Sequence, residues 1–129
     1  MDAKSSMALT AVMRVIDAKN AGGVKQFIDR GELDADAKAC AFVYAARKPS
    51  VEMLKLFLDA GVSVNARNRD GMTALMSASA NGYMESVKFL IEKGGDILIK
   101  DNGGMTALRF AVSNENDDIA RLLKSLGAK

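Results

Sequence analysis

The chain repeats itself at an interval of 33 residues. The string Gly-Met-Thr-Ala-Leu begins at Gly71 and again at Gly104, and the same shift matches apolar residues on both sides of it. The matched sets are Phe42, Leu75 and Leu108; Ala45, Ala78 and Ala111; Leu54, Val87 and Ala120; and Phe57, Leu90 and Leu123. A shift of 30 residues matches one earlier copy, in which Gly31 falls on Gly61. Four structural units, the first with a shorter connection to the second, account for this pattern.

Each unit carries the pattern of two helices joined by a tight turn. In the third unit a short first helix ends at Asn81, and apolar residues then recur at helical spacing until Gly94 ends a second helix. The segments 62–70 and 95–103 carry the turn signals Asp-Gly and Asn-Gly, so we expect hairpin-like fingers there. One such unit cannot bury its apolar face alone, and stacking four of them builds a continuous core. The predicted fold is an all-α solenoid.

Composition agrees with such a fold and excludes several classes of protein. Hydrophobic residues make up 49% and charged residues 26% of the 129 residues, as in a globular domain, and aromatic residues are only 5%. A net charge of +2 is too small to indicate a nucleic-acid-binding protein. Cys40 is the only cysteine, which excludes an internal disulfide and suits a reducing compartment. With no apolar run of membrane-spanning length and no secretory signal pattern, the expected location is cytoplasmic.

No constellation of catalytic, cofactor-binding or metal-binding residues is found. The Gly-Gly pairs lack the spacing of a phosphate-binding loop, and the carboxylate-rich stretches lack the spacing of a calcium loop. The chain has no histidine, so Cys40 has no obvious activating base and is interpreted as a buried or half-buried structural cysteine. We therefore expect no enzyme activity, no cofactor and no metal.

The repeated unit resembles the ankyrin repeat. The stretch "NRDGMTALMSASANGYMESVKFLIEKGGD" from Asn68 to Asp96 is similar to the family pattern of a finger, a D-x-x-G-x-T-P-L-H-x-A helix and a V-x-x-L-L-x-x-G helix. The likeness extends over residues 8–129. The family proline is replaced by Ala74 and Ala107, and the family histidine by Met76 and Arg109. Lys38-Ala39-Cys40 stands where Gly-x-Thr begins a helix, which leaves open whether a finger precedes this helix.

The resemblance implies one ankyrin-repeat domain over residues 1–129, with approximate units 1–34, 35–67, 68–100 and 101–129. In the last unit Lys124 stands where the third unit has Ile91, so the final helix should present a polar outer face. We expect Asn116 to cap this helix, with two aspartates in its first turn.

Ankyrin repeats usually meet partners on a concave side built from finger tips and the exposed faces of the first helices. The positions that the resemblance assigns to this side in the second to fourth units are Tyr44, Arg47, Lys48, Arg67, Arg69, Asp70, Met72, Ser77, Asn81, Lys100, Asn102, Met105, Phe110 and Asn114. The set has a basic bias, opposed mainly by Asp36, Asp70 and Asp101, whereas acids mark the second helices at Glu52, Asp59, Glu85, Glu92, Asp117 and Asp118. We therefore expect charge to be segregated between the two faces.

These observations favour a non-catalytic protein-binding module, acting as an inhibitor or an adaptor. A basic concave surface would steer a partner with an acidic surface towards it. The alternative is binding of nucleic acid or another acidic ligand through the basic stripe, which lacks interleaved stacking aromatics. An enzyme that uses carboxylates alone would need a cleft, and this repeat offers a shallow groove. The protein is expected to be monomeric by itself and not to bind membranes.

Overall fold

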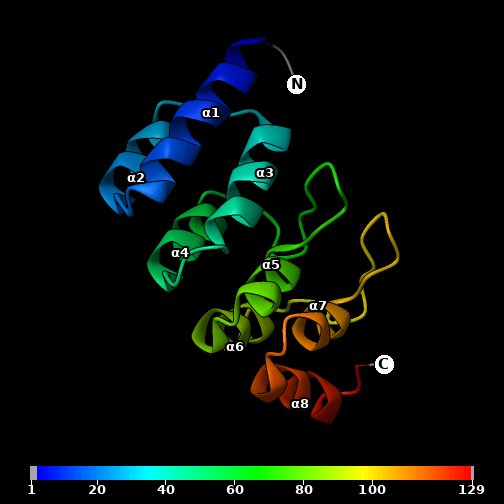
Figure 1. Cartoon of the computed structure of the whole chain (residues 1–129). Coiled ribbons are helices and arrows are strands. Elements are labelled where there is room, and N and C mark those ends of the chain that lie inside the picture. The colour runs from blue at the N-terminus through cyan, green and yellow to red at the C-terminus, as the bar shows by residue number, and fades with distance from the viewer. Residues whose placement is uncertain (1–2, 129) are drawn as a thin grey trace.

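The computed structural model describes residues 3–128, and this part of the chain forms eight α-helices and no strand. The helices are α1 (Ala3–Asp17), α2 (Ala21–Asp29), α3 (Ala35–Ala45), α4 (Val51–Asp59), α5 (Ala74–Asn81), α6 (Met84–Glu92), α7 (Ala107–Ser113) and α8 (Asp117–Ser125). Consecutive helices pack as four pairs, and the pairs stack in chain order. Figure 1 shows the first helices of the pairs in one row and the second helices in another, with two loops projecting beside them. The predicted all-α stack of four pairs is confirmed.

The apolar positions matched by the repeat form the core. Each of them is buried, and even Ala120, where the last unit replaces the larger Val87, is only 7% exposed. Phe42 and Phe57 are fully buried within the second pair, with their ring centroids 6.1 Å apart. The repeat marks the core because each unit buries the same surface against its neighbours.

Threonine and glycine mark where the helices of the later units begin and end. The Thr73 hydroxyl accepts a hydrogen bond from the Met76 amide, and the Thr106 hydroxyl accepts one from the Arg109 amide, each at 3.3 Å. Glycine follows the second helix of every pair with a positive φ of 70° to 100°, which other residues rarely adopt, at Gly31, Gly61, Gly94 and Gly127.

The second unit departs from this plan. Asp34 is the N-cap of α3, and its carboxylate accepts a hydrogen bond of 2.8 Å from the Ala37 amide, which lowers the pKa of Asp34. The Asp34 amide in turn donates to the Ser5 hydroxyl of α1, 3.1 Å away. Cys40 therefore lies inside α3, and the interpretation of this residue as the start of a helix is wrong. Residues that form a finger in later units are helical here, so only residues 30–34 connect α2 to α3 and no finger precedes α3.

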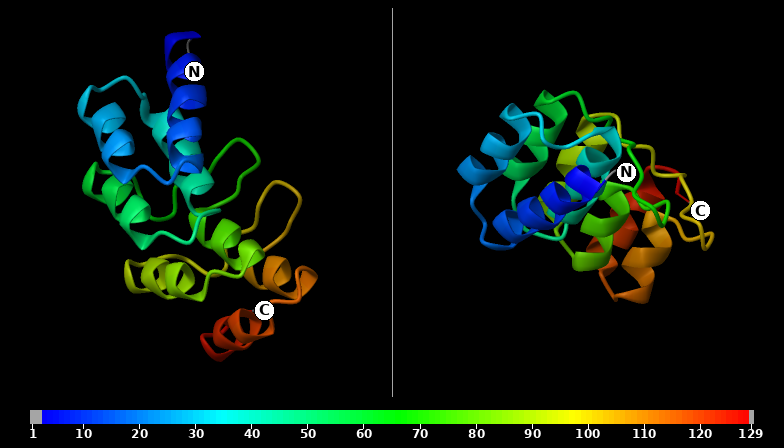
Figure 2. Two further views of the ribbon diagram at one scale, coloured as in Figure 1. Left: turned by 60° about the vertical axis from the view of Figure 1, so that its left-hand side comes forward. Right: turned by 90° about the horizontal axis from the view of Figure 1, so that it is seen from above.

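The two predicted fingers form between later pairs. In the first, Asn68 and Met72 are joined by a backbone hydrogen bond of 2.9 Å, and in the second Asp101 and Met105 are joined in the same way. The fingers lie side by side (Figure 2) and are bonded to each other. The backbone amide of Asn102 donates to the backbone carbonyl of Asp70 at 2.9 Å.

The last pair confirms one expectation and corrects another. Lys124 is exposed on α8, as a terminal position should be, although Val112 and Leu126 are also about half exposed. Asn116 occupies the N-cap position of α8, with Asp117 and Asp118 in the first turn as expected, but its side chain makes no capping bond. Its amide nitrogen instead donates to the Ser79 and Ala80 carbonyls at the end of α5, at 2.7 and 3.1 Å, because these carbonyls no longer have partners within their own helix.

Candidate functional site

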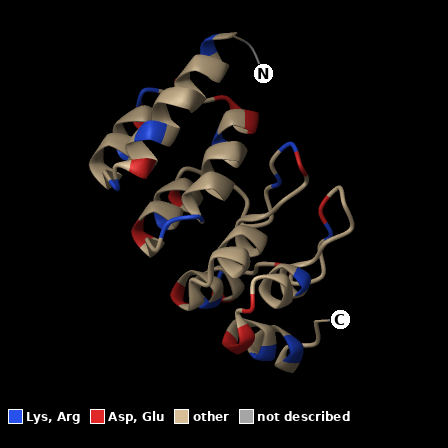
Figure 3. Ribbon diagram, viewed as in Figure 1, with Lys and Arg blue, Asp and Glu red and all other residues tan. Residues whose placement is uncertain are grey.

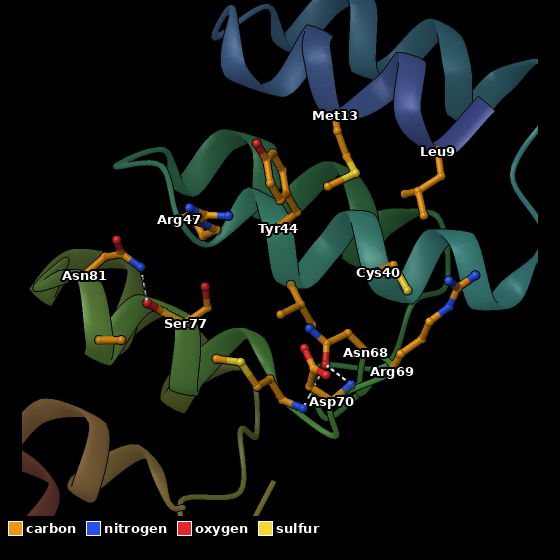
Figure 4. Close-up of a pocket in the computed structure, with 13 residues that line it drawn as sticks. Leu9, Met13, Cys40, Tyr44, Arg47, Asn68, Arg69, Asp70, Ser77 and Asn81 are labelled. Atoms are coloured by element: carbon orange, nitrogen blue, oxygen red, sulfur yellow. Dashed lines mark hydrogen bonds between the residues drawn. The ribbon is translucent and has the colours of Figure 1, made fainter. Parts of the chain in front are cut away.

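An open groove lies between α3 and α5, bordered by α1 and by the first finger (Figure 4). Its volume is about 470 Å³. The side chains that line it are Leu9, Met13, Cys40, Val43, Tyr44, Arg47, Asn68, Arg69, Asp70, Met72, Ser77, Ala80 and Asn81. Most of these residues are apolar or uncharged, and the charged ones come from the end of α3 and from the finger.

The groove brings together most of the predicted partner-binding residues of the second and third units. Those that line it are Tyr44, Arg47, Arg69, Asp70, Met72, Ser77 and Asn81. Ser77 is only 3% exposed, so it forms the bottom of the groove rather than its rim. The predicted residues outside the lining are Lys48, Arg67, Lys100, Asn102, Met105, Phe110 and Asn114. The fourth unit and the second finger thus extend beyond this groove.

Helix α1 adds two lining residues that the sequence reasoning missed. Leu9 and Met13 lie four residues apart on α1, so they share one face, and both are half-buried. The 30-residue shift places Leu9 on Ala39 and Met13 on Val43, neither of which the sequence assigned to the concave side, so the repeat gave no signal for them. Cys40, predicted as a structural cysteine, is half-buried and lines the same groove.

Tyr44 is held in place at one end of the groove. Its hydroxyl lies 2.8 Å from both carboxylate oxygens of Asp17, at the end of α1, and donates to them. The Lys48 ammonium lies 3.1 Å from the same carboxylate. The Arg47 guanidinium packs on the Tyr44 ring, 5.1 Å from the ring centroid. Aromatic and guanidinium groups are thereby presented together in a fixed arrangement.

The same contacts shift two pKa values. The hydrogen bond to Asp17, with partial burial and the charge of Asp17, raises the pKa of Tyr44 above its ordinary value. The hydrogen bond from Tyr44, followed by the one from Lys48, lowers the pKa of Asp17. At neutral pH the pair is therefore a neutral phenol donating to an ionised carboxylate.

Comparison with known protein families assigns the architecture. A family model described as ankyrin repeats (three copies) matches residues 12–101 and, in an overlapping match, residues 42–129. The chain belongs to the ankyrin repeat family. Ankyrin repeats are generally protein-binding modules and typically non-catalytic, and no enzyme family matches this chain. No curated protein matches it either.

In this ankyrin repeat stack the basic bias of the concave side is weaker than the sequence suggests. Lys48 is paired with Asp17, which the sequence reasoning did not place there. Arg67 donates to the Gly71 carbonyl at 2.9 Å and to the Lys100 carbonyl at 2.6 Å, so it joins the two fingers. Arg47 is exposed and packs on Tyr44. Positive charge at the groove therefore comes from individual arginines and not from a continuous basic stripe.

The predicted segregation of charge between the two faces of the ankyrin stack is wrong. Figure 3 shows both signs of charge on α4, α6 and α8. Lys55 on α4 and Lys88 on α6 are exposed beside the acids that the prediction emphasised. A lysine stands between two acids on α4 and on α6, and α8 carries two acids and two cations, so the outer row carries little net charge.

The described part of the chain contains neither a metal-binding cluster nor a membrane-spanning helix. Across residues 3–128, no group of three or more cysteine, aspartate or glutamate side chains is arranged to hold a metal ion. Within the same range, every helix is too short or too polar to cross a membrane.

Proposed function

We propose that this ankyrin repeat protein is a non-catalytic module that binds a protein partner in the groove between α3 and α5, and so acts as an inhibitor or an adaptor. The observation that carries the proposal is the fixed Tyr44, which stands at an open, largely apolar groove with Arg47 packed on its ring. Tyrosine and arginine are enriched among the residues that dominate binding energy at protein interfaces.

The arrangement of Tyr44 favours binding because its conformational freedom is already restricted. A side chain that becomes ordered only on binding opposes association by about 0.5 to 1.5 kcal/mol. The Asp17 carboxylate holds the Tyr44 hydroxyl before any partner arrives. The half-buried Leu9, Met13 and Met72 supply the apolar surface beside it.

Binding of nucleic acid through a basic stripe is less well supported. Lys48 is paired with Asp17, and Arg67 donates hydrogen bonds to two backbone carbonyls. The acidic Asp70 lines the groove itself. A phosphate backbone is recognised through several accessible cations, and its binding weakens steeply with salt. The groove offers few such cations.

The experiment starts with a partner identified by cross-linking the intact protein in its own cells, followed by association and dissociation kinetics with purified proteins. Tyr44→Ala should speed dissociation by an amount equivalent to about 2 kcal/mol or more, the range of interface residues that dominate binding. Arg47→Glu should slow association and reduce its dependence on salt, since an exposed charge acts on encounter.

Glu85→Lys is the matched control for Arg47→Glu, because Glu85 is exposed on α6 in the outer row. It should leave both rate constants unchanged. A partner lost through Glu85→Lys and retained by the Tyr44 and Arg47 variants would contradict the proposal and assign binding to the outer helices. A thermal melt of each variant separates loss of binding from loss of folding.

A further inference from the structure

We infer that the groove binds a short partner segment carrying a large aliphatic side chain and an aspartate or glutamate, with the carboxylate on Arg47. The inference rests on the proposed function and specifies what is recognised there. Two independent features carry it, namely the apolar walls of the groove and the Arg47 guanidinium at one end, which forms no ion pair with a carboxylate of residues 3–128.

The apolar walls come from three different helices and the finger. Leu9 and Met13 point from α1 towards α3 (Figure 4), and the other apolar lining includes Val43 of α3, Ala80 of α5 and Met72, which follows the finger. Met13 and Met72 are flexible thioethers, which adapt to side chains of different shape. The volume of about 470 Å³ lies within the range of small-ligand sites, so it suits a few side chains of a short segment.

The guanidinium of Arg47 is available to an anion. Arg47 is exposed and its guanidinium lies over the Tyr44 ring, and in residues 3–128 it forms no ion pair with a carboxylate. The nearby Asp17 is already bonded to Tyr44 and Lys48. A planar guanidinium matches the two oxygens of a carboxylate in a bidentate pair.

The charges around the groove select the position of the carboxylate. On the finger side Asp70 and Arg69 both line the groove, so their charges oppose each other. At the other end Lys48 opposes the charge of Asp17 and leaves that of Arg47. The carboxylate of the segment therefore belongs at the Arg47 end of α3, and its aliphatic side chain points between α1 and the finger.

The test uses a random library of displayed linear peptides selected on the intact protein, followed by synthesis of the enriched peptides. We expect enriched sequences to combine leucine, isoleucine or methionine with a nearby aspartate or glutamate. Enrichment of apolar peptides without an acid, of basic peptides, or of no peptide at all would overturn the inference.

Methionine methyl NMR then locates the bound peptide. The chain carries Met13 and Met72 in the groove, whereas Met53 is buried in the core and Met7 is 75% exposed on α1 outside the groove lining. Signals of Met13 and Met72 should shift on titration, and those of Met7 and Met53 should stay in place. Shifts confined to methionines outside the groove would contradict the assignment.

A pair of substitutions tests the carboxylate contact itself. Arg47→Gln should weaken peptide binding about tenfold or more, as expected for loss of a hydrogen bond between charged groups. Replacing the acid of the peptide by its amide should weaken binding to the unaltered protein equally, and have little further effect on Arg47→Gln. Arg109→Gln, at an exposed position of α7 outside the groove, is the control. Independent effects of the two changes would overturn the contact.

These outcomes are separable from those of the proposed function. A folded partner that needs Tyr44 can exist although no linear peptide binds, in which case the inference fails and the proposed function stands. If the kinetics with the folded partner assign binding to the outer helices, the proposed function fails, and peptide binding in the groove is still decided by the methionine signals.

Discussion

The Tyr44 hydroxyl and the Asp17 carboxylate join the first two ankyrin repeats, with the hydroxyl 2.8 Å from both carboxylate oxygens. Asp17 ends α1 and Tyr44 belongs to α3, so the bond crosses the boundary between two repeats. Each group changes the pKa of the other, and the bond can therefore be followed by titration.

The pKa of Tyr44 should fall towards its ordinary value of 10.0 when Asp17 is replaced by asparagine. The hydrogen bond to a charged acceptor and the negative charge of Asp17 both favour the neutral phenol, and the asparagine side chain removes the charge. Tyr44 and Tyr83 are the only tyrosines, so in a Tyr83→Phe background the alkaline absorbance change of tyrosinate reports Tyr44 alone. An unchanged midpoint in Asp17→Asn would show that Asp17 does not hold Tyr44 in solution.

The acid dependence of stability should differ between the unaltered protein and Asp17→Asn. The pKa of Asp17 is lower in the folded protein than its ordinary value of 3.8, so ionised Asp17 stabilises the fold above that value. This contribution is lost as the pH falls through the lowered pKa. Urea unfolding at several pH values should therefore show a difference between the two proteins at neutral pH that narrows in acid. A constant difference would contradict the assignment.

Gly71→Ala should destabilise the protein more than Gly104→Ala, although the two glycines occupy the same repeat position. Both have a positive φ, +77° and +82°, so alanine is strained at both by about 1 to 2 kcal/mol. A methyl group at Gly71 would lie 2.5 Å from the Asn102 side-chain oxygen and 2.8 Å from the Arg67 guanidinium, whereas at Gly104 it would meet nothing within 4 Å.

The measurement is denaturant unfolding of both variants, combined with hydrogen exchange of the Asn102 amide, which donates to the Asp70 carbonyl. Exchange of this amide should speed up in Gly71→Ala and stay unchanged in Gly104→Ala. Equal losses of stability and equal exchange would mean that the fingers are not packed against each other at Gly71.

Asn116→Ala should lower the free energy of unfolding by about 1 to 3 kcal/mol, the range for leaving partly buried polar groups without partners. Its amide nitrogen bonds two carbonyls at the end of α5 and so ties the last repeat to the third. Asn114→Ala is the matched control, because the Asn114 side chain is exposed and bonds only the Phe110 carbonyl of its own helix. Similar losses in the two variants would argue against a link between repeats at Asn116.

Leu90→Ala should destabilise the protein by about 2 to 5 kcal/mol, as large-to-small changes in a packed core do. Leu90 is fully buried on α6, between the second and fourth pairs. Lys124→Ala, on the exposed side of α8, should have little effect. Denaturant melts compare the two, and equal effects would refute the assignment of core and end.

The sequence alone determined the repeat, the number of helix pairs and the core. Matched residues such as Leu75, Ala78 and Leu90 are all buried, because in a stacked array each unit needs the same apolar face for its nearest neighbours. The two fingers were also predictable, since Asp-Gly and Asn-Gly turn signals are local. About half of the groove was predictable too, because matched positions on successive first helices face the same side.

Only the tertiary structure decided the contacts between side chains that lie far apart in the sequence. Tyr44 and Asp17 are 27 residues apart and Asn116 and Ser79 are 37 apart, and an asparagine can cap its own helix or bond another with equal chemical plausibility. The tertiary structure also decided where α3 begins. Asp34 caps the helix and bonds Ser5 of α1, so α3 extends through the residues that form a finger in the later repeats. A repeat pattern fixes which faces pack, but a polar side chain selects its partner from the groups that packing brings within about 3 Å.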